Sequence, residues 1–244
     1  NEVVIDASSS ERMRSLLVMH QGELLVETYF NGAGPELAAN LKSVTKSLAA
    51  ALTGIALREG WVESLEDPIS RYLGYYVKSG SEKGQITLRQ LLTMSTGLTS
   101  IGYGAVQQSE DWVAAVLDQR IREKSERGFA YDTPVLQLLT AVIETASGMS
   151  IAQISQRYLL EPLDAELAHW RVDAKQIALG GNDAYLRPKD LIKLGELYRL
   201  GGIWRGERIL PEEFVQASID HQIMPKTSMV NHQTLPVRGY GYLW

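Results

Sequence analysis

The stretch LKSVTKSLAAALTGIALREG, residues 41–60, constrains the fold more than any other part of the chain. From Leu48 to Leu57 almost every residue is small or apolar, on all sides of the helix that the pattern predicts. A helix without a polar face lies inside a protein core. We therefore expect a central helix over residues 43–58, ended by Gly60, around which the other elements pack.

Lys46 stands in the first turn of this apolar helix, three residues after Ser43. Residues spaced i and i+3 share a helix face, so the two side chains come within hydrogen-bonding reach. Burial disfavours the ammonium form, which predicts a lowered pKa for Lys46 and a role as base toward Ser43. The unpaired Ser43 N–H at the helix N-terminus is suited to an oxyanion. The pattern indicates Ser-Lys nucleophilic catalysis. The alternative is a chance Ser-x-x-Lys whose lysine extends its amine to water.

Composition narrows the class of protein. The 244 residues, 45% of them hydrophobic, suffice for one large domain or two lobes that share a core. The net charge of -5 carries no long run of either sign, which argues against a nucleic-acid surface. The longest apolar run is too short for a membrane span. The absence of cysteine excludes disulfides, thiolate metal sites and a cysteine nucleophile, and it fits an exported or a cytosolic protein.

Two β-rich runs near the N-terminus flank Gln21-Gly22, which predicts a hairpin, and the final RGYGYLW reads as a strand. The chain opens at NEVVIDASSS without an initiator Met, which is compatible with a removed leader, and the sequence does not decide whether there was one. A strand that ended at Trp244 would leave an apolar edge open, so we expect the natural sequence to continue beyond it.

The middle of the chain is helical. Capping boxes are predicted at Thr87 with Gln90 and at Ser150 with Gln153, an N-cap at Thr133, and helix starts at Pro188 and Pro211. Strands at both ends with helices between them predict an α+β fold. We expect an α/β sandwich lobe, with an antiparallel sheet built from both termini, over residues 1–60 and 185–244. An all-helical lobe is inserted over residues 61–184.

Four segments occur in the order known from one superfamily. They are SVTKSLAAALTGIALREGWVESLEDPISRYL, ITLRQLLTMSTGL, GFAYDT and GGNDAYLRPKDLIKLGELYRLGG. Together they make residues 15–215 resemble the serine β-lactamases and penicillin-binding proteins. The likeness is to the branch of class C β-lactamases, D-alanyl-D-alanine carboxypeptidases, esterases and 6-aminohexanoate-oligomer hydrolases.

The resemblance implies a role for each matched residue. Ser43 would be the acyl-accepting nucleophile, Lys46 its base and Tyr131 the second general acid/base, while Thr133 would contribute to substrate binding. A tyrosine in a loop just before a helix is displayed toward a cleft, which agrees with that role, although a lone tyrosine there can also cover the helix end. The substrate would be a small or peptide-like amide or ester, with no metal or cofactor, and export would be favoured over the cytoplasm. The oligomeric state is not predicted.

The chain departs from the family pattern in three places. Thr133 replaces the asparagine of many β-lactamases, and Arg127-Gly128 replaces Pro-Gly. The Lys/His-Thr/Ser-Gly motif is missing, because the Lys-Thr-Ser at residues 226–228 precedes YGYLW and is interpreted as a loop. These departures favour an alternative, a non-hydrolytic penicillin-binding or ligand-sensing protein. An interaction protein on the same scaffold is a third reading. His20, His169, His221 and His232 show no ligand spacing.

Overall fold

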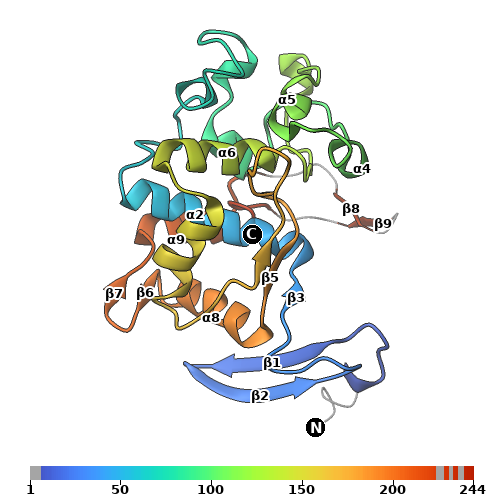
Figure 1. Cartoon of the computed structure of the whole chain (residues 1–244), viewed down its shortest axis with the longest axis vertical. Helices are drawn as coiled ribbons and strands as arrows, with labels where there is room; N and C mark the ends of the chain where they lie inside the picture. Colours follow the sequence, from blue (N-terminus) through green and yellow to red (C-terminus); the bar gives the residue numbers. More distant parts are fainter. Residues whose placement is uncertain (1–6, 224–227, 231–232, 236–238) are drawn as a thin grey trace.

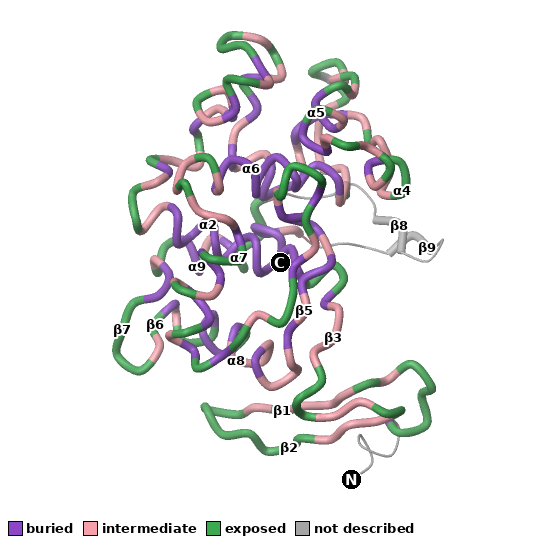
Figure 2. Tube along the Cα trace, viewed as in Figure 1, coloured by how far each residue is buried: buried purple, intermediate pink, exposed green. Residues whose placement is uncertain are grey.

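The central helix is present and almost wholly buried. The computed structural model describes residues 7–223, 228–230, 233–235 and 239–244 (Figure 1). Helix α2 (Thr45–Arg58) crosses the middle of the molecule and follows a 3-10 turn, η1 (Lys42–Val44). Every residue from Thr45 to Ala56 is buried, which Figure 2 shows as a continuous buried segment. The helix starts two residues later than predicted because Lys42 has a positive φ of 49° and the chain first forms the tighter turn.

Small residues let neighbouring elements approach α2 closely. It contacts α6 (Leu136–Ser147), α9 (Glu212–Ile219) and the π-helical segment η5 (Ser155–Leu160). At Gly54, a Cβ atom would lie 2.7 Å from the ring of Phe214 on α9. Because a packed core tolerates no such overlap, a glycine is required where α9 rests on α2.

The predicted helix ends are mostly confirmed. Capping boxes at Thr87 and Ser150 begin α3 (Leu88–Leu92) and α7 (Ile151–Ile154), and α8 (Pro188–Arg199) begins with its proline. The predicted N-cap at Thr133 is wrong, because α6 begins at Leu136 and the Thr133 hydroxyl contacts Lys46 instead. The remaining helices are η2 (Ile69–Arg71), η3 (Lys83–Gln85), α4 (Tyr103–Val106), α5 (Trp112–Leu117) and η4 (Lys124–Glu126). None of the helices in the described ranges is long and apolar enough to cross a bilayer.

The described strands pair in antiparallel fashion in four small sheets. The predicted hairpin is confirmed: β1 (Ser15–His20) pairs with β2 (Glu23–Tyr29) through Gln21 and Gly22, both at positive φ. A three-stranded sheet has the order β3 (Ala39–Asn40), β5 (Ala184–Leu186) and β4 (His169–Trp170). Two further hairpins are β6 (Ile203–Trp204) with β7 (Glu207–Arg208) and β8 (Ser228–Val230) with β9 (Gln233–Leu235). The α+β fold with antiparallel strands is therefore present.

The expected strand at residues 239–244 is not formed. Tyr240 makes only an isolated bridge with Ile223, and Leu243 has a φ of 63°, which is incompatible with an extended strand. The Leu243 N–H donates instead to Leu92 O at the end of α3, so this segment folds onto the helices rather than beside β1. The division into lobes at residues 60 and 185 stays a prediction.

Candidate functional site

Ser43 lies exposed in the turn at the N-terminus of α2, directly above a buried lysine. Strand β3 ends at Asn40, and the side-chain Oδ1 of Asn40 accepts a hydrogen bond from the Lys42 N–H at 2.8 Å. This contact supports the left-handed conformation of Lys42, from which the chain turns into η1. The Ser43 N–H donates to no group within the described ranges, so it is available to a ligand.

Lys46 extends beneath Ser43 with only 2% of its surface exposed. Its Nζ has three oxygen neighbours: Ser43 Oγ at 3.1 Å, Thr133 Oγ1 at 3.1 Å and Gly181 O at 2.7 Å. Burial lowers the pKa of Lys46 to about 8, although the charge of Asp132 opposes the shift. A substantial neutral fraction therefore exists near neutral pH, and its lone pair can face Ser43 while N–H groups remain on the other two oxygens.

Tyr131 borders the same site from the loop that precedes α6. The centroid of its ring lies 5.0 Å from Lys46 Nζ, and the residue is 52% exposed. Two bonds attach this loop to α3's end: the Ala130 N–H donates to Met94 O at 2.8 Å, and the Asp132 N–H to Met94 Sδ at 3.2 Å. The phenol is thus held beside the amine and remains open to solvent.

Asp132 supplies negative charge next to the lysine. Its Oδ1 accepts a hydrogen bond from Ser100 Oγ at 2.6 Å. Burial raises the pKa of Asp132, against the hydrogen bond from Ser100 and the positive charges of Arg122 and Lys46. Because Asp132 and Lys46 act on each other electrostatically, the basicity of the lysine depends on the ionisation of this carboxyl.

The turn at Gly180-Gly181 packs against the segment that carries Thr133 and supplies the carbonyl that accepts from Lys46. Neither glycine has a positive φ. A Cβ at Gly180 would lie 2.4 Å from Leu136 O, and one at Gly181 would lie 2.6 Å from Thr133 O. Both glycines therefore allow the backbone that carries the Lys46 acceptor to pack directly on the segment that carries Thr133.

The structure brings together all four residues that the sequence singled out: Ser43 and Thr133 each contact Lys46 Nζ, and Tyr131 stacks near it. Sequence reasoning missed Gly181, whose carbonyl is the shortest contact of the lysine. Two adjacent glycines are a signal of a turn or of close backbone approach, and this pair could have pointed to the contact. Of the Lys-Thr-Ser segment, residues 226 and 227 lie outside the described residues, and Ser228 begins β8.

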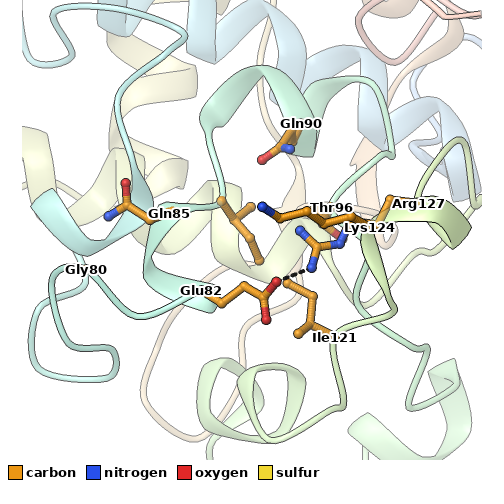
Figure 3. Close-up of a pocket in the computed structure, with 9 residues that line it drawn as sticks. Gly80, Glu82, Gln85, Gln90, Thr96, Ile121, Lys124 and Arg127 are labelled. Atoms are coloured by element: carbon orange, nitrogen blue, oxygen red, sulfur yellow. Dashed lines mark hydrogen bonds and ion pairs between the residues drawn. The ribbon is translucent and has the colours of Figure 1, made fainter.

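An apolar cavity of about 470 Å³ adjoins Ser43. Its walls include Val44, Leu191, Leu194 and Leu243. A second cavity, of about 360 Å³, lies among η3, α3 and the loop before Tyr131 (Figure 3). Figure 3 shows the ion pair between Glu82 and Arg127, two of the residues that line it. Ser43 lines the first cavity and not the second, so the first is the candidate substrate site. No cluster of His, Asp and Glu within the described ranges is suited to a metal ion.

Comparisons with known proteins identify a family and several relatives. The sequence model of the β-lactamase family matches residues 7–215. A 6-aminohexanoate-dimer hydrolase from Paenarthrobacter ureafaciens is 24% identical over 230 residues, which cover 83% of this chain and 56% of that protein. The chain therefore spans little more than half the length of this relative.

Solved structures share the fold. A protein from Bacillus anthracis, provisionally assigned as a 6-aminohexanoate-dimer hydrolase, superposes with a TM-score of 0.79 at 18% identity, over 100% of this chain and 66% of that one. A class C β-lactamase from Rhodobacter sphaeroides gives a TM-score of 0.65 at 20% identity, over 90% of this chain and 69% of the enzyme.

Proposed function

Because this chain belongs to the β-lactamase family, we propose that it is a serine hydrolase that cleaves an amide or ester through an acyl-enzyme. Ser43 is the nucleophile, Lys46 the general base and Tyr131 the second acid/base. The observation that carries the proposal is the buried Lys46 amine 3.1 Å below the exposed Ser43 hydroxyl. A lysine with a pKa of about 8 is partly neutral at physiological pH, and only the neutral amine can accept the serine proton.

In the acylation step, Ser43 Oγ attacks the carbonyl carbon while its proton passes to Lys46 Nζ. The Ser43 N–H, at the N-terminus of η1 and α2, stabilises the oxyanion of the tetrahedral intermediate. Tyr131 donates a proton to the leaving amine or alcohol, and its exposure leaves it within reach of a bound substrate. In the second step Tyr131 takes a proton from water, which attacks the acyl carbonyl, and Lys46 returns its proton to the departing Ser43 Oγ.

Gly181 and Thr133 orient the lysine for both steps. The Gly181 carbonyl can only accept, so one N–H of Lys46 points to it in either protonation state. With a second N–H on Thr133 Oγ1, the remaining sp³ direction of the nitrogen faces Ser43. No metal or organic cofactor takes part in this scheme.

A second candidate function is a penicillin-binding or ligand-sensing protein that is acylated but does not turn over. Thr133 favours it, since a hydroxyl already engaged with Lys46 stands where many β-lactamases present an amide to the substrate. D-Alanyl peptides, β-lactams, simple esters and linear amides are the substrate classes to compare, and the hydrolase is our primary proposal.

Intact-mass spectrometry tests the proposal. The chain is incubated with a fluorophosphonate, which labels activated serines, and in parallel with a penicillin and with a p-nitrophenyl ester. We expect one phosphonyl adduct on Ser43 and ester turnover. Ser43→Ala removes the adduct, whereas Ser47→Ala, one helical turn along α2, retains it. An acyl adduct on Ser43 that persists for hours would favour the sensing protein, and an unlabelled Ser43 would overturn both functions.

A further inference from the structure

Asp183 is a buried carboxylate that neither the catalytic scheme nor the sequence analysis uses. It follows Gly181 by two residues, is 8% exposed and has a φ of 62°. A left-handed conformation in a residue other than glycine persists only where surrounding contacts maintain it. The contacts of the side chain supply that constraint.

Three polar side chains from three separate segments contact this carboxylate. Asn40 Nδ2, at the end of β3, donates to Oδ1 at 2.8 Å, and the Tyr103 hydroxyl, in α4, donates to Oδ2 at 2.6 Å. Arg171, after β4, pairs with Oδ2 at 3.5 Å. Burial by itself would raise the pKa of Asp183, but the hydrogen bonds from Tyr103 and Asn40 outweigh it and keep the pKa below its usual value. The group is therefore an anion that accepts hydrogen bonds from Asn40 and Tyr103 and forms an ion pair with Arg171.

Through Asn40, this anion acts on the turn that carries Ser43. With its amide nitrogen fixed by Asp183 and by the Tyr185 hydroxyl at 3.0 Å, Asn40 presents Oδ1 to the Lys42 N–H. Lys42 is the left-handed residue directly before the nucleophile candidate. The orientation of Ser43 thus depends on a hydrogen-bond chain that begins at Asp183.

The segment around Asp183, residues 181–184, also contacts the start of α2 and its lysine. Gly181 O accepts from Lys46 Nζ at 2.7 Å, and the Ala184 N–H donates to Thr45 Oγ1 at 3.2 Å. Residues 181–184 consequently contact the side chains of Thr45 and Lys46, the first two residues of α2. Because Asp183 fixes the backbone between these two contacts, its side chain sets the position of the lysine's carbonyl partner.

We propose that Asp183 is a positioning residue for acyl transfer, whose carboxylate holds the Ser43 turn and the Gly181 carbonyl in one arrangement. The inference rests on the proposed function of Ser43 and Lys46. It assigns to Asp183 no contact with the substrate. Loss of the carboxylate frees Asn40 and the 181–184 backbone, and displacements of about 1 Å between reacting groups slow a chemical step about a hundredfold.

The test measures fluorophosphonate labelling of Ser43 as a function of reagent concentration, which separates the maximal labelling rate from the reagent's apparent affinity. For Asp183→Ala we expect the maximal rate to fall about tenfold to a hundredfold, with the affinity changed less than about twofold. Asp183→Asn, which tolerates a left-handed backbone and still accepts from Asn40, recovers most of the rate. Tyr103→Phe, which removes one donor, lowers it about twofold to fivefold.

Asp173→Asn is the matched control. Asp173 is also a buried carboxylate, but its Oδ1 accepts from the Lys175 and Ile177 amides in a turn that does not contact the Ser43 turn. This variant lowers the melting temperature without lowering the maximal labelling rate.

Three results would overturn the inference. The first is a wild-type maximal rate in a folded Asp183→Ala protein. The second applies if Asp183→Ala does not fold, and is a wild-type maximal rate in Tyr103→Phe. In both cases, labelling of Ser43 in the wild-type protein would still support the proposed function. An unlabelled Ser43 in the wild type would instead overturn the proposed function, and this inference with it.

Discussion

Lys46 Nζ lies closer to the Gly181 carbonyl oxygen, at 2.7 Å, than to the hydroxyl of Ser43, at 3.1 Å. The lysine is therefore anchored to the backbone of a distant turn and directed at the serine by that anchor. A carbonyl cannot take the proton that the serine releases, so this contact orients the amine without competing for the proton.

Lys46→Met should lower the rate of Ser43 acylation about a thousandfold, since general base catalysis is lost. In the wild type, acylation should rise with pH around a midpoint near 8, the pKa of the buried amine. The lysine is charged in the unfolded chain up to 10.5 and neutral in the folded chain above 8, so the free energy of unfolding should rise between these values.

Chemical denaturation of the wild type and of Lys46→Met across this pH range measures the rise in the free energy of unfolding. The variant should lack the rise of about 3 kcal/mol that the wild type shows. Lys78→Met, which removes an exposed lysine, serves as the control and should keep it. Equal pH dependence in both variants would contradict burial of the amine.

Asp132→Asn should shift the midpoint of the acylation profile to lower pH. The carboxylate raises the pKa of Lys46, so its neutralisation enlarges the fraction of neutral amine. At pH 6.5 acylation should become about twofold to fivefold faster. Rates over pH 6–9 measure the shift, and Asp118→Asn, an exposed carboxylate after α5, should leave the midpoint in place. A midpoint that moves upward would contradict the electrostatic account.

Gly181→Ala should slow acylation about tenfold or more, because the added Cβ would lie 2.6 Å from Thr133 O and 2.7 Å from Thr133 Cγ2. The backbone must separate at this point, and Lys46 then loses one of its two orienting oxygens. The free energy of unfolding should fall by about 1–3 kcal/mol. Gly104→Ala, in α4 with no atom within 4 Å of the new Cβ, is the control for the substitution itself.

Glu144→Gln should remove a pH dependence of stability far from the site. Burial raises the pKa of Glu144 to about 7, even though its Oε1 accepts from the Ile151 N–H at 2.8 Å. The protonated carboxyl stabilises the fold below pH 4.5, and this stabilisation is lost as the pH rises through 7. The wild type should lose about 3 kcal/mol over that interval. Melting temperatures at pH 5 and pH 7.5 measure the effect, and the difference between them should be smaller in Glu144→Gln than in the wild type. An equal difference in the two proteins would contradict the assignment.

Features that depend on a few neighbouring residues could be predicted from the sequence. The hairpin at Gln21-Gly22 and the capping boxes at Thr87 and Ser150 are local, so the chain adopts them wherever it is folded. The contact between Ser43 and Lys46 follows from their spacing along one helix turn.

The parts that were missed or wrong depend on tertiary contacts. Thr133 fits an N-cap by local rules, but the amine of Lys46 engages its hydroxyl, and α6 begins three residues later. Asn40 and Asp183 carry no local signal, because their roles arise only when β3 and β5 lie side by side. The YGYLW segment alternates like a strand, yet Tyr242 is buried with its ring 5.7 Å from that of Phe214 on α9.

The separation of the Lys46 partners along the chain also bears on how the protein folds. Thr133 and Gly181 are 87 and 135 residues away from the lysine. Loops of such length close late, after the local helices have formed. Until they close, Lys46 remains hydrated and as basic as a lysine in a peptide, and Ser43 is an ordinary alcohol. Reactivity of Ser43 during refolding would therefore report the completion of the native topology, after the recovery of helical structure.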